Sequence, residues 1–271
     1  MKRVLIILSA ALLWCNVLPA AATEFEAGDF CYTISAEDLT AEVISVVKNH
    51  AGLSQLSIPE SVEYEGKTYR VVAIGNKVFS QCTSLTSISI PDGITSIGDS
   101  AFWSCSGLKT ITIPDNVTTI GHAAFFSCEA LTSVTIGSRV TTIGDFAFYN
   151  CRRLTTITIP DKVASIGKKT FLECKKLQSV IFGKNLADIG DNAFENCTGL
   201  KQLTVYNAQP PKARLSIFKN VAVANCTLYV PVESAELYQS EGVERFRHDR
   251  GNRSSRRPLG DTANRRRRNG V

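Results

Sequence analysis

Histidine is scarce and closely spaced cysteine pairs are missing in this 271-residue sequence. It has three histidines, His50, His122 and His248, and no C-x-x-C pair. Nucleophilic catalysis of the Cys–His or Ser–His type needs a histidine beside the nucleophile, and a zinc site needs convergent ligands. No G-x-x-x-x-G-K-[ST], H-E-x-x-H or EF-hand pattern is present either. We therefore expect no enzyme activity, no metal site and no cofactor.

Long apolar runs are missing after the first segment of the chain. Two basic residues follow Met1, then come an apolar run over 4–18 and small residues ending at Ala22. A charged start, a short apolar core and a small-residue cleavage site are typical of a signal peptide, and the run is too short to span a membrane. The sequence predicts a signal peptide at 1–22 and an exported, secreted or cell-surface chain without a transmembrane segment.

What the sequence does contain is one 23-residue pattern, clearest over 85–107, that recurs without an insertion. Five columns keep the step: leucine, an Ile-Gly pair, phenylalanine and cysteine. The leucines are Leu85, Leu108, Leu131, Leu154, Leu177 and Leu200. The phenylalanines are Phe79, Phe102, Phe125, Phe148, Phe171 and Phe194. A fixed period of this length built on L-x-x-[LI]-x-[LI] is the signature of a leucine-rich-repeat solenoid.

Each coil contains a short alternating segment, exemplified by Ile111-Thr112-Ile113. Alternation of β-branched residues is typical of a strand, here with the isoleucines pointing inward. Pro114 ends the strand, because proline donates no hydrogen bond to a ladder. Successive strands are expected to form one parallel sheet at a spacing of about 4.8 Å, with Ile111 beside Val134.

The rest of the coil supplies two further apolar edges. Val117 and Ile120 turn inward, Gly121 allows the backbone to turn a corner, and Phe125 fills the third side together with Cys128. A single coil cannot bury these edges, whereas stacked coils bury them against one another. The predicted fold class is mainly β: a leucine-rich-repeat solenoid of 23-residue coils with N- and C-terminal caps.

The cysteines follow the same period, which favours buried, reduced thiols over disulfides. Six of them share one inward position: Cys82, Cys105, Cys128, Cys151, Cys174 and Cys197. Free cysteine packs as a small hydrophobic residue. Cys31 and Cys226 lie outside the column and near opposite ends of the repeat, so a disulfide between them is not expected.

The two flanks lack the period and are interpreted as caps. Residues 30–34 and 43–47 read as strands, a hairpin turn is expected at Glu65-Gly66, and 234–239 resembles a helix. Caps cover the apolar ends that a solenoid would otherwise expose. The predicted division of the chain is signal peptide 1–22, N-terminal cap 23–57, solenoid 58–204, C-terminal cap 205–244 and an arginine-rich tail 245–271.

The tail carries the basic charge of the chain. Residues 245–271 contain ten arginines and two aspartates, a net charge of +8 against +5 for the whole chain. With so few apolar residues, this segment is expected to be disordered. The run Arg265 to Arg268 leaves open a role in polyanion binding, alongside the interpretation that the tail is incidental.

Two surfaces of the solenoid are candidates for partner binding. The outward strand positions form a hydroxyl-rich face, and one position after the repeating phenylalanine forms an aromatic stripe. The strand-face residues are Thr110, Thr112, Ser133, Thr135, Thr156 and Thr158. The stripe residues are Trp103, Phe126 and Tyr149. Threonine simply suits exposed strands and the aromatics could only pad the core, but aromatics also dominate interface hot spots.

The unit I-P-x-x-V-x-x-I-G-x-x-A-F-x-x-C-x-x-L resembles the BspA-type leucine-rich repeat. Ile113-Pro114, Ile120-Gly121 and Ala124-Phe125 carry the resemblance, which covers roughly residues 56–240. It implies an exported binding protein, with some family members implicated in adhesion to host proteins and other cells, and it implies no catalytic residues. The departure is at the end, where an arginine-rich segment replaces the family's usual aromatic-containing cap.

The resulting functional expectation is a monomeric binding or adhesion module. Its partner is a protein or glycan of the host extracellular matrix or another cell surface, and not a specific nucleic acid. The alternatives are an enzyme-associated or structural surface domain, and polyanion binding through the tail.

Overall fold

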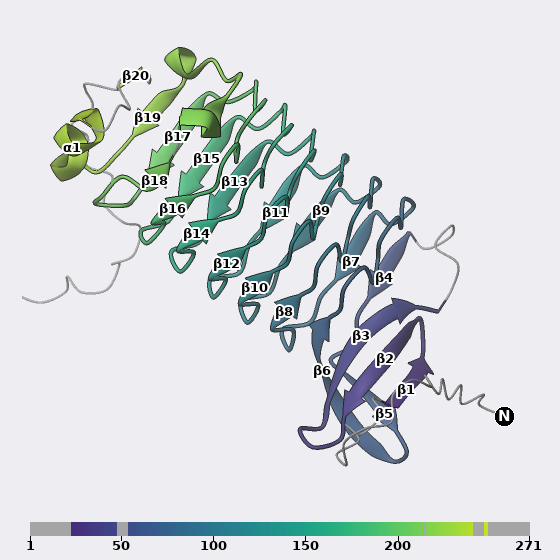
Figure 1. Ribbon diagram of the computed structural model, residues 1–271. Helices are drawn as coiled ribbons and strands as arrows, with labels where there is room; N and C mark the ends of the chain where they lie inside the picture. The colour runs from purple at the N-terminus through teal and green to yellow at the C-terminus, as the bar shows by residue number, and fades with distance from the viewer. Residues whose placement is uncertain (1–22, 48–53, 214, 241–246, 249–271) are drawn as a thin grey trace, which may run out of the picture.

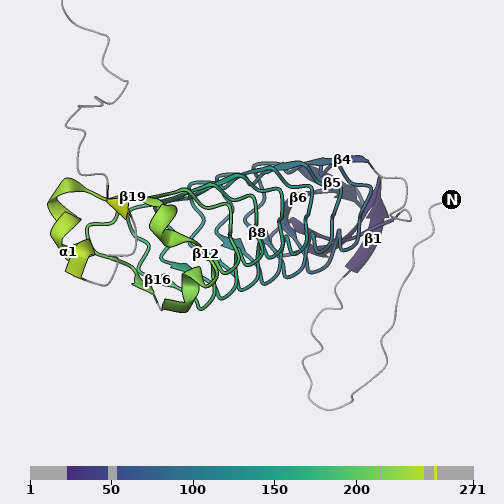
Figure 2. The same ribbon diagram turned by 90° about the horizontal axis from the view of Figure 1, so that it is seen from above.

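The computed structural model describes residues 23–47, 54–213, 215–240 and 247–248. The chain forms one elongated stack of coils, with strands β1 to β3 at one end and helix α1 at the other (Figure 1). The view from above shows the coils repeating along this axis (Figure 2). The predicted signal peptide lies outside the described residues.

One sheet runs the length of the stack, in the order β1-β2-β3-β6-β8-β10-β12-β14-β16-β18, with β5 paired to β6. Its strands are β1 (Thr23–Ala27), β2 (Phe30–Ser35), β3 (Thr40–Val46), β5 (Ser61–Tyr64), β6 (Lys67–Ile74), β8 (Ser96–Ile97), β10 (Thr119–Ile120), β12 (Thr142–Ile143), β14 (Ser165–Ile166), β16 (Asp188–Ile189) and β18 (Lys212–Ala213). From β3 onward every step along this path is parallel. The inward-turning edge predicted at Ile120 is therefore a strand in its own right.

The second face of the stack carries the strands predicted from the L-x-x-I-x-I segment, together with one short last strand that was not predicted. They are β4 (Gln55–Ser57), β7 (Ser87–Ser89), β9 (Thr110–Thr112), β11 (Ser133–Thr135), β13 (Thr156–Ile159), β15 (Ser179–Phe182), β17 (Gln202–Val205), β19 (Thr227–Tyr229) and β20 (Arg247–His248). Ile111 pairs with Val134 in a parallel register, as expected. The continuous sheet expected here is divided into three ladders, β4-β7, β9-β11 and β13-β15-β17-β19-β20. We call this surface the strand face.

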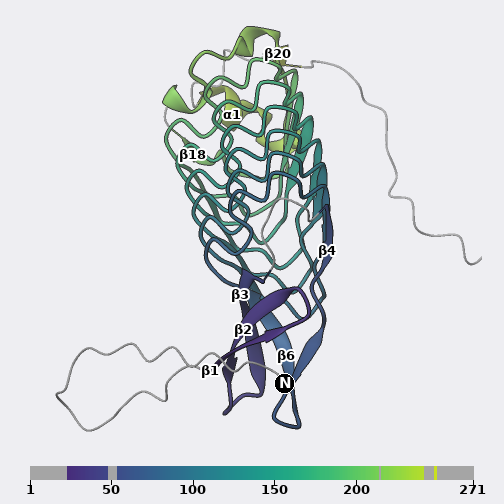
Figure 3. The same cartoon turned by 90° about the vertical axis from the view of Figure 1, so that its right-hand side faces the viewer.

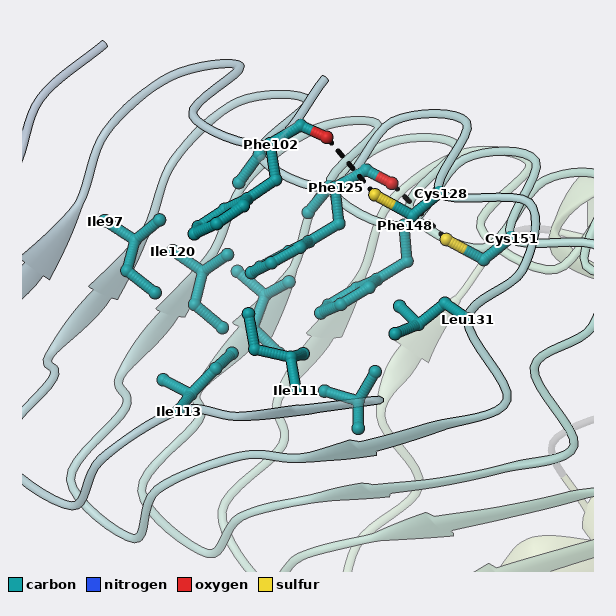
Figure 4. Packing of buried hydrophobic residues seen from close by; sticks show 14 of the residues in the cluster. Ile97, Phe102, Ile111, Ile113, Ile120, Phe125, Cys128, Leu131, Phe148 and Cys151 are labelled. Carbon is teal, nitrogen blue, oxygen red and sulfur yellow. Dashed lines mark hydrogen bonds between the residues drawn. The ribbon is translucent and has the colours of Figure 1, made fainter. Parts of the chain in front are cut away.

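The core is a column of phenylalanine rings that runs through the stack (Figure 4). Consecutive rings from Phe79 to Phe194 are nearly parallel, with centroids 4.9 to 5.5 Å apart. Phe30 of β2 meets the first ring edge-on at 6.1 Å, and Phe218 stacks on the last at 5.7 Å. The predicted phenylalanine column is thus the centre of the core, and a ring from each flanking segment covers its ends.

The cysteine column lies beside these rings and is reduced, as predicted. All six of its members and Cys226 are buried and form no disulfide, while Cys31 is partly exposed. Each thiol from Cys105 onward donates to a backbone carbonyl of the preceding coil, as Cys128 does to Phe102 at 3.2 Å (Figure 4). The column therefore ties each coil to its predecessor.

The reason for glycine in the Ile-Gly pair differs from the expected one. Gly121 does not have a left-handed backbone, and the corner is turned instead at non-glycine residues. A Cβ on Gly121 would lie 2.7 Å from the carbonyl carbon of Gly98 in the preceding coil. Glycine is required at this position because neighbouring coils approach closely, and that contact cannot be read from one coil alone.

Two positions in each coil turn the corner with positive φ angles. The first column is Lys77, Ser100, Ala123, Phe146, Lys169 and Asn192, with φ between 51° and 60°. The second is Gln81, Ser104, Ser127, Asn150, Glu173 and Asn196, with φ between 56° and 67°. The segment between these columns forms the third side of the coil, which we call the outer wall. Figure 3 shows the sides of successive coils in line along the stack.

The ends of the stack contain the remaining elements. The predicted hairpin turn is present, with Glu65 and Gly66 both at positive φ between β5 and β6. The C-terminal end contains η2 (Leu215–Phe218), η3 (Val223–Asn225), η4 (Val232–Ser234) and α1 (Ala235–Ser240), close to the helix expected at 234–239. Within the predicted tail, Arg247 and His248 form β20 and pair with β19, which differs from the expected disorder. The other tail residues lie outside the described residues, and the boundaries of the caps stay predictions.

Candidate binding surface

The three predicted stripe residues lie together on the outer wall. Trp103 stacks on Phe126 with centroids 6.1 Å apart, and Phe126 stacks on Tyr149 at 4.4 Å with an angle of 11° between the rings. All three side chains are half-buried. The inward neighbours Phe102, Phe125 and Phe148 fill the core, so the stripe is a second, outer aromatic column. We keep the name aromatic stripe for Trp103, Phe126 and Tyr149.

Phe146 extends this surface, although it was not among the predicted stripe residues. Its ring lies 6.1 Å from Tyr149 and 5.5 Å from His122, and the Lys169 ammonium lies 5.4 Å from its centroid. Its φ of 58° is unusual for a bulky side chain, and such strain gathers at functional sites. The available signal was that Phe146 occupies a position held by lysine, serine, alanine or asparagine in the other coils.

Polar side chains hold the wall in place beside the stripe. Asn150 is only 8% exposed, and its amide donates to Ser127 Oγ at 3.0 Å and to Glu129 Oε1 at 3.2 Å. Its side-chain oxygen accepts a hydrogen bond from Arg152 Nε at 2.7 Å. The backbone under Tyr149 is therefore fixed by contacts between consecutive coils, and the stripe is preorganised.

The six predicted strand-face residues are also at the surface. Thr110 pairs with Ser133 and Thr112 with Thr135, and these four are exposed together with Thr156 and Thr158. Their hydroxyls alternate with buried Ile111, Val134 and Ile157. The structure places them in rows, on a different side of the coil from the aromatic stripe.

The C-terminal end of the strand face is more apolar than its predicted hydroxyl-rich part. Tyr206, directly after β17, is 55% exposed, and Tyr229 of β19 is 40% exposed. Tyr229 lies in register with Thr204 and, one strand further, with Ile181. The repeat pattern decays after Leu200, so these positions could not be assigned to a face from the period.

The aspartates that recur in turns have a structural role, because Asp99, Asp115 and Asp145 each accept a backbone N–H of the next coil. Asp99 accepts the backbone N–H of His122 at 2.7 Å, and Asp145 accepts that of Lys168 at 2.6 Å. Asp115 likewise accepts from Ser138 at 2.7 Å, and this bond is the main reason that the pKa of Asp115 lies below its usual value. These carboxylates cap the following coil, and among the described residues no group of three or more potential ligands could hold a metal.

The thiols of the cysteine column are buried, and burial favours their protonated form. Burial is the main cause that raises the pKa of Cys174 to about 12, and it raises the pKa of Cys128 and Cys151 as well. The reactive form of cysteine is the thiolate, which this environment disfavours. His122 is exposed and lies against the Phe146 ring rather than beside a thiol.

Comparisons with known proteins identify the family to which this fold belongs. The family model for the BspA type leucine rich repeat region matches the chain in six copies, including residues 45–171, 72–201 and 104–229. The chain belongs to the BspA-type leucine-rich repeat family. A comparison with curated proteins gave no match.

Two solved structures resemble this member of the family over most of its length. A leucine-rich cell surface protein from Faecalibacterium prausnitzii is 30% identical, with 69% of this chain and 56% of that chain covered and a TM-score of 0.56. The T. pallidum leucine-rich repeat protein is 27% identical, with 68% and 85% covered and a TM-score of 0.60. Family and neighbours are leucine-rich repeat proteins. In the described part of the chain, no helix has the length and apolarity that a bilayer crossing requires.

Proposed function

We propose that this BspA-type protein is a cell-surface or secreted binding module whose partner docks on the outer wall, over the aromatic stripe. The observation that supports this is the row of half-buried rings of Trp103, Phe126 and Tyr149 on a rigid wall. Aromatic side chains bury large areas at a small cost in rotamer entropy, and they are enriched in interface hot spots.

The stacking geometry favours a protein partner over a neutral glycan. Both faces of the Phe126 ring are occupied, one by Trp103 and one by Tyr149. The edges of these rings are left for a ligand, and edges pack well against the side chains and aromatic faces of another protein. A neutral sugar, which stacks on an open ring face, has no such platform at Phe126. The strand face, with its threonine hydroxyls, would set the register of a partner that extends around the coil.

Export of the protein is part of the proposal. It is supported by the signal-peptide pattern and by the similarity to a cell surface protein. The segment before Ala22 has the pattern of a signal peptide. The Faecalibacterium relative is described as a cell surface protein, and this chain spans 56% of its length. Placement at a surface would present the outer wall to proteins of the matrix or of another cell.

The experiment compares two double variants of the full chain. Trp103→Ala with Tyr149→Ala removes the two ends of the stripe, while Thr112→Ala with Thr135→Ala removes two exposed hydroxyls from the strand face. Extracellular-matrix proteins and bacterial surface proteins are first screened with the unaltered chain, and the affinity of each variant for the captured partner is then measured.

We expect the aromatic double variant to lose more than about 2 kcal/mol of binding free energy, the usual hot-spot threshold. The threonine double variant should change little. Circular dichroism and an unfolding curve for each variant separate lost binding from lost folding. A larger loss in the threonine variant, with folding intact, would move the site to the strand face.

A further inference from the structure

A cluster of cations occupies one corner of the solenoid, where the outer wall of two consecutive coils turns toward the strand face. Arg152 and Arg153 lie in one coil, Lys175 and Lys176 in the next, and all four are exposed. The two turns are adjacent, because the Lys176 N–H donates to the Arg152 carbonyl at 3.3 Å. The same corner of the other regular coils carries no basic residue. We call these four residues the basic corner.

The wall holds Arg152 in a fixed orientation. Its Nε donates to the side-chain oxygen of Asn150 at 2.7 Å, and Asn150 is itself held by Ser127 and Glu129. One edge of the guanidinium is thereby used, and its terminal nitrogens have no acceptor among the described residues. An arginine fork positioned in this way is suited to bidentate binding of an oxyanion.

The nearby acids do not neutralise the corner. Glu173 accepts a salt bridge from Lys175 at 3.0 Å and a hydrogen bond from Asn196, and these contacts hold its pKa below the usual value. Glu129 is bonded to Asn150. Arg153 and Lys176 have no ion-pair partner in the part of the chain that the structure describes. The corner therefore retains an excess of positive charge.

We propose that the basic corner is an anion-binding site for a polyanionic polysaccharide, whose sulfate or carboxylate groups contact Arg152, Arg153 and Lys176. The site is separate from the aromatic stripe and from the arginine-rich tail. Cations that repeat at the coil spacing of about 4.8 Å match a polymer that carries closely spaced anionic groups. Such a polymer gains affinity from many weak contacts at once and from release of its counterions.

Two other polyanions fit the corner less well. Single-stranded nucleic acid is bound by stacking its bases on open aromatic faces, and the central ring of the aromatic stripe, Phe126, is covered on both sides. An acidic peptide commonly adds backbone pairing or apolar anchors to its charges. Here the N–H of Lys175 is already bonded to Glu173, the N–H of Lys176 to Arg152, and the corner side chains are all charged.

The test uses the full chain with the eight arginines from Arg250 to Arg268 replaced by glutamine, so that the tail does not mask the corner. Arg153→Gln with Lys176→Gln removes two unpaired cations. Lys162→Gln with Lys184→Gln is the matched control, because it removes the same charge from exposed turns of two consecutive coils, where the only ion pair among the described residues is the long one of Lys184 with Asp161 at 3.9 Å. Arg152→Lys keeps the charge and removes the fork. Binding of heparin, which carries sulfates and carboxylates, and of hyaluronate, which carries carboxylates alone, is measured in about 0.1 M salt, where surface charges are partly screened.

We expect the corner double variant to weaken heparin binding about tenfold, as loss of two ionic contacts implies, and the control to weaken it less than about twofold. Arg152→Lys should fall between them, with the native circular dichroism spectrum retained. The two glycans show which anionic group is preferred. The proposal is overturned if the parent chain binds neither glycan, if both double variants lose equal affinity, or if oligothymidylate or polyglutamate binds more tightly than both glycans.

Discussion

At the scale of single residues, the core consists of positions that repeat in identical environments. Phe125 is fully buried between Phe102 and Phe148, with centroids 5.0 and 5.2 Å away. Phe126, the next residue, is half-buried on the outer wall. Adjacent residues of one type therefore have opposite roles, one in the core and one in the proposed site.

This contrast predicts the effect of two truncations. Phe125→Ala should lower the free energy of unfolding by about 3–5 kcal/mol, because a large core side chain is lost and a cavity remains. Phe126→Ala, the matched control, should cost much less. Denaturant unfolding followed by circular dichroism measures both. A loss below about 1 kcal/mol for Phe125→Ala would show that its column is not core, and an equal cost for Phe126→Ala would show that the aromatic stripe is part of the core.

The cysteine column makes a second prediction at this scale. Seven of the eight cysteines from Cys31 onward are buried and Cys31 is partly exposed, so a thiol reagent should label Cys31 alone in the folded protein. Raising the pH to about 9.5 ionises an ordinary thiol, but burial keeps the pKa of Cys174 at about 12, so the pattern should persist. Mass spectrometry counts the labels. Rapid labelling of Cys128 or Cys151 in the native state would contradict the burial of this column.

At the scale of elements, each coil is held to the next by contacts that recur every 23 residues. Asn76 Oδ1 accepts the N–H of Asp99 at 2.6 Å, and Asp99 in turn accepts that of His122 at 2.7 Å. The phenylalanine and cysteine columns could be predicted because their period and polarity identify an inward position. The hydrogen bonds of Asn76 and Asp99 could not be predicted, because the sequence of a turn does not tell whether its polar side chain faces solvent or the next coil.

The Asp99 contact can be tested with a near-isosteric control. Asp99→Ala should destabilise the protein by about 1–2 kcal/mol, because the N–H of His122 loses its acceptor. Asp99→Asn should change stability little, because asparagine already plays this role at residue 76. Denaturant unfolding curves measure the stability of both variants. Equal losses of unfolding free energy would mean that the charge of Asp99, and not its hydrogen bond, stabilises this turn.

Other features escaped prediction because they depend on how the coils turn and meet. The close approach at Gly121 arises from how one coil meets the next, whereas the positive φ of Phe146 belongs to a turn that recurs in every regular coil. The stripe residues were found because they share one column with a fixed step. The basic corner mixes two residue types over only two coils, so it gives no repeat signal.

At the scale of the whole molecule, the solenoid divides core, wall and strand face among separate sides of each coil. The core columns account for the fold, which leaves the outer wall and the strand face free to differ between coils. Over the regular coils the wall carries the aromatic stripe, the turn beside it carries the basic corner, and the strand face carries mainly hydroxyls. A partner that binds the wall would therefore contact residues that differ from coil to coil, held on a backbone that repeats.

Hydroxyl-radical footprinting of the complex with the captured partner tests the central claim, that binding takes place on the outer wall. Aromatic side chains report their own exposure, and the chain offers tyrosines on both candidate faces. The account predicts protection of Trp103, Phe126 and Tyr149 on binding, with Tyr206 and Tyr229 of the strand face unchanged. Protection of Tyr206 and Tyr229 with an unchanged stripe would contradict it.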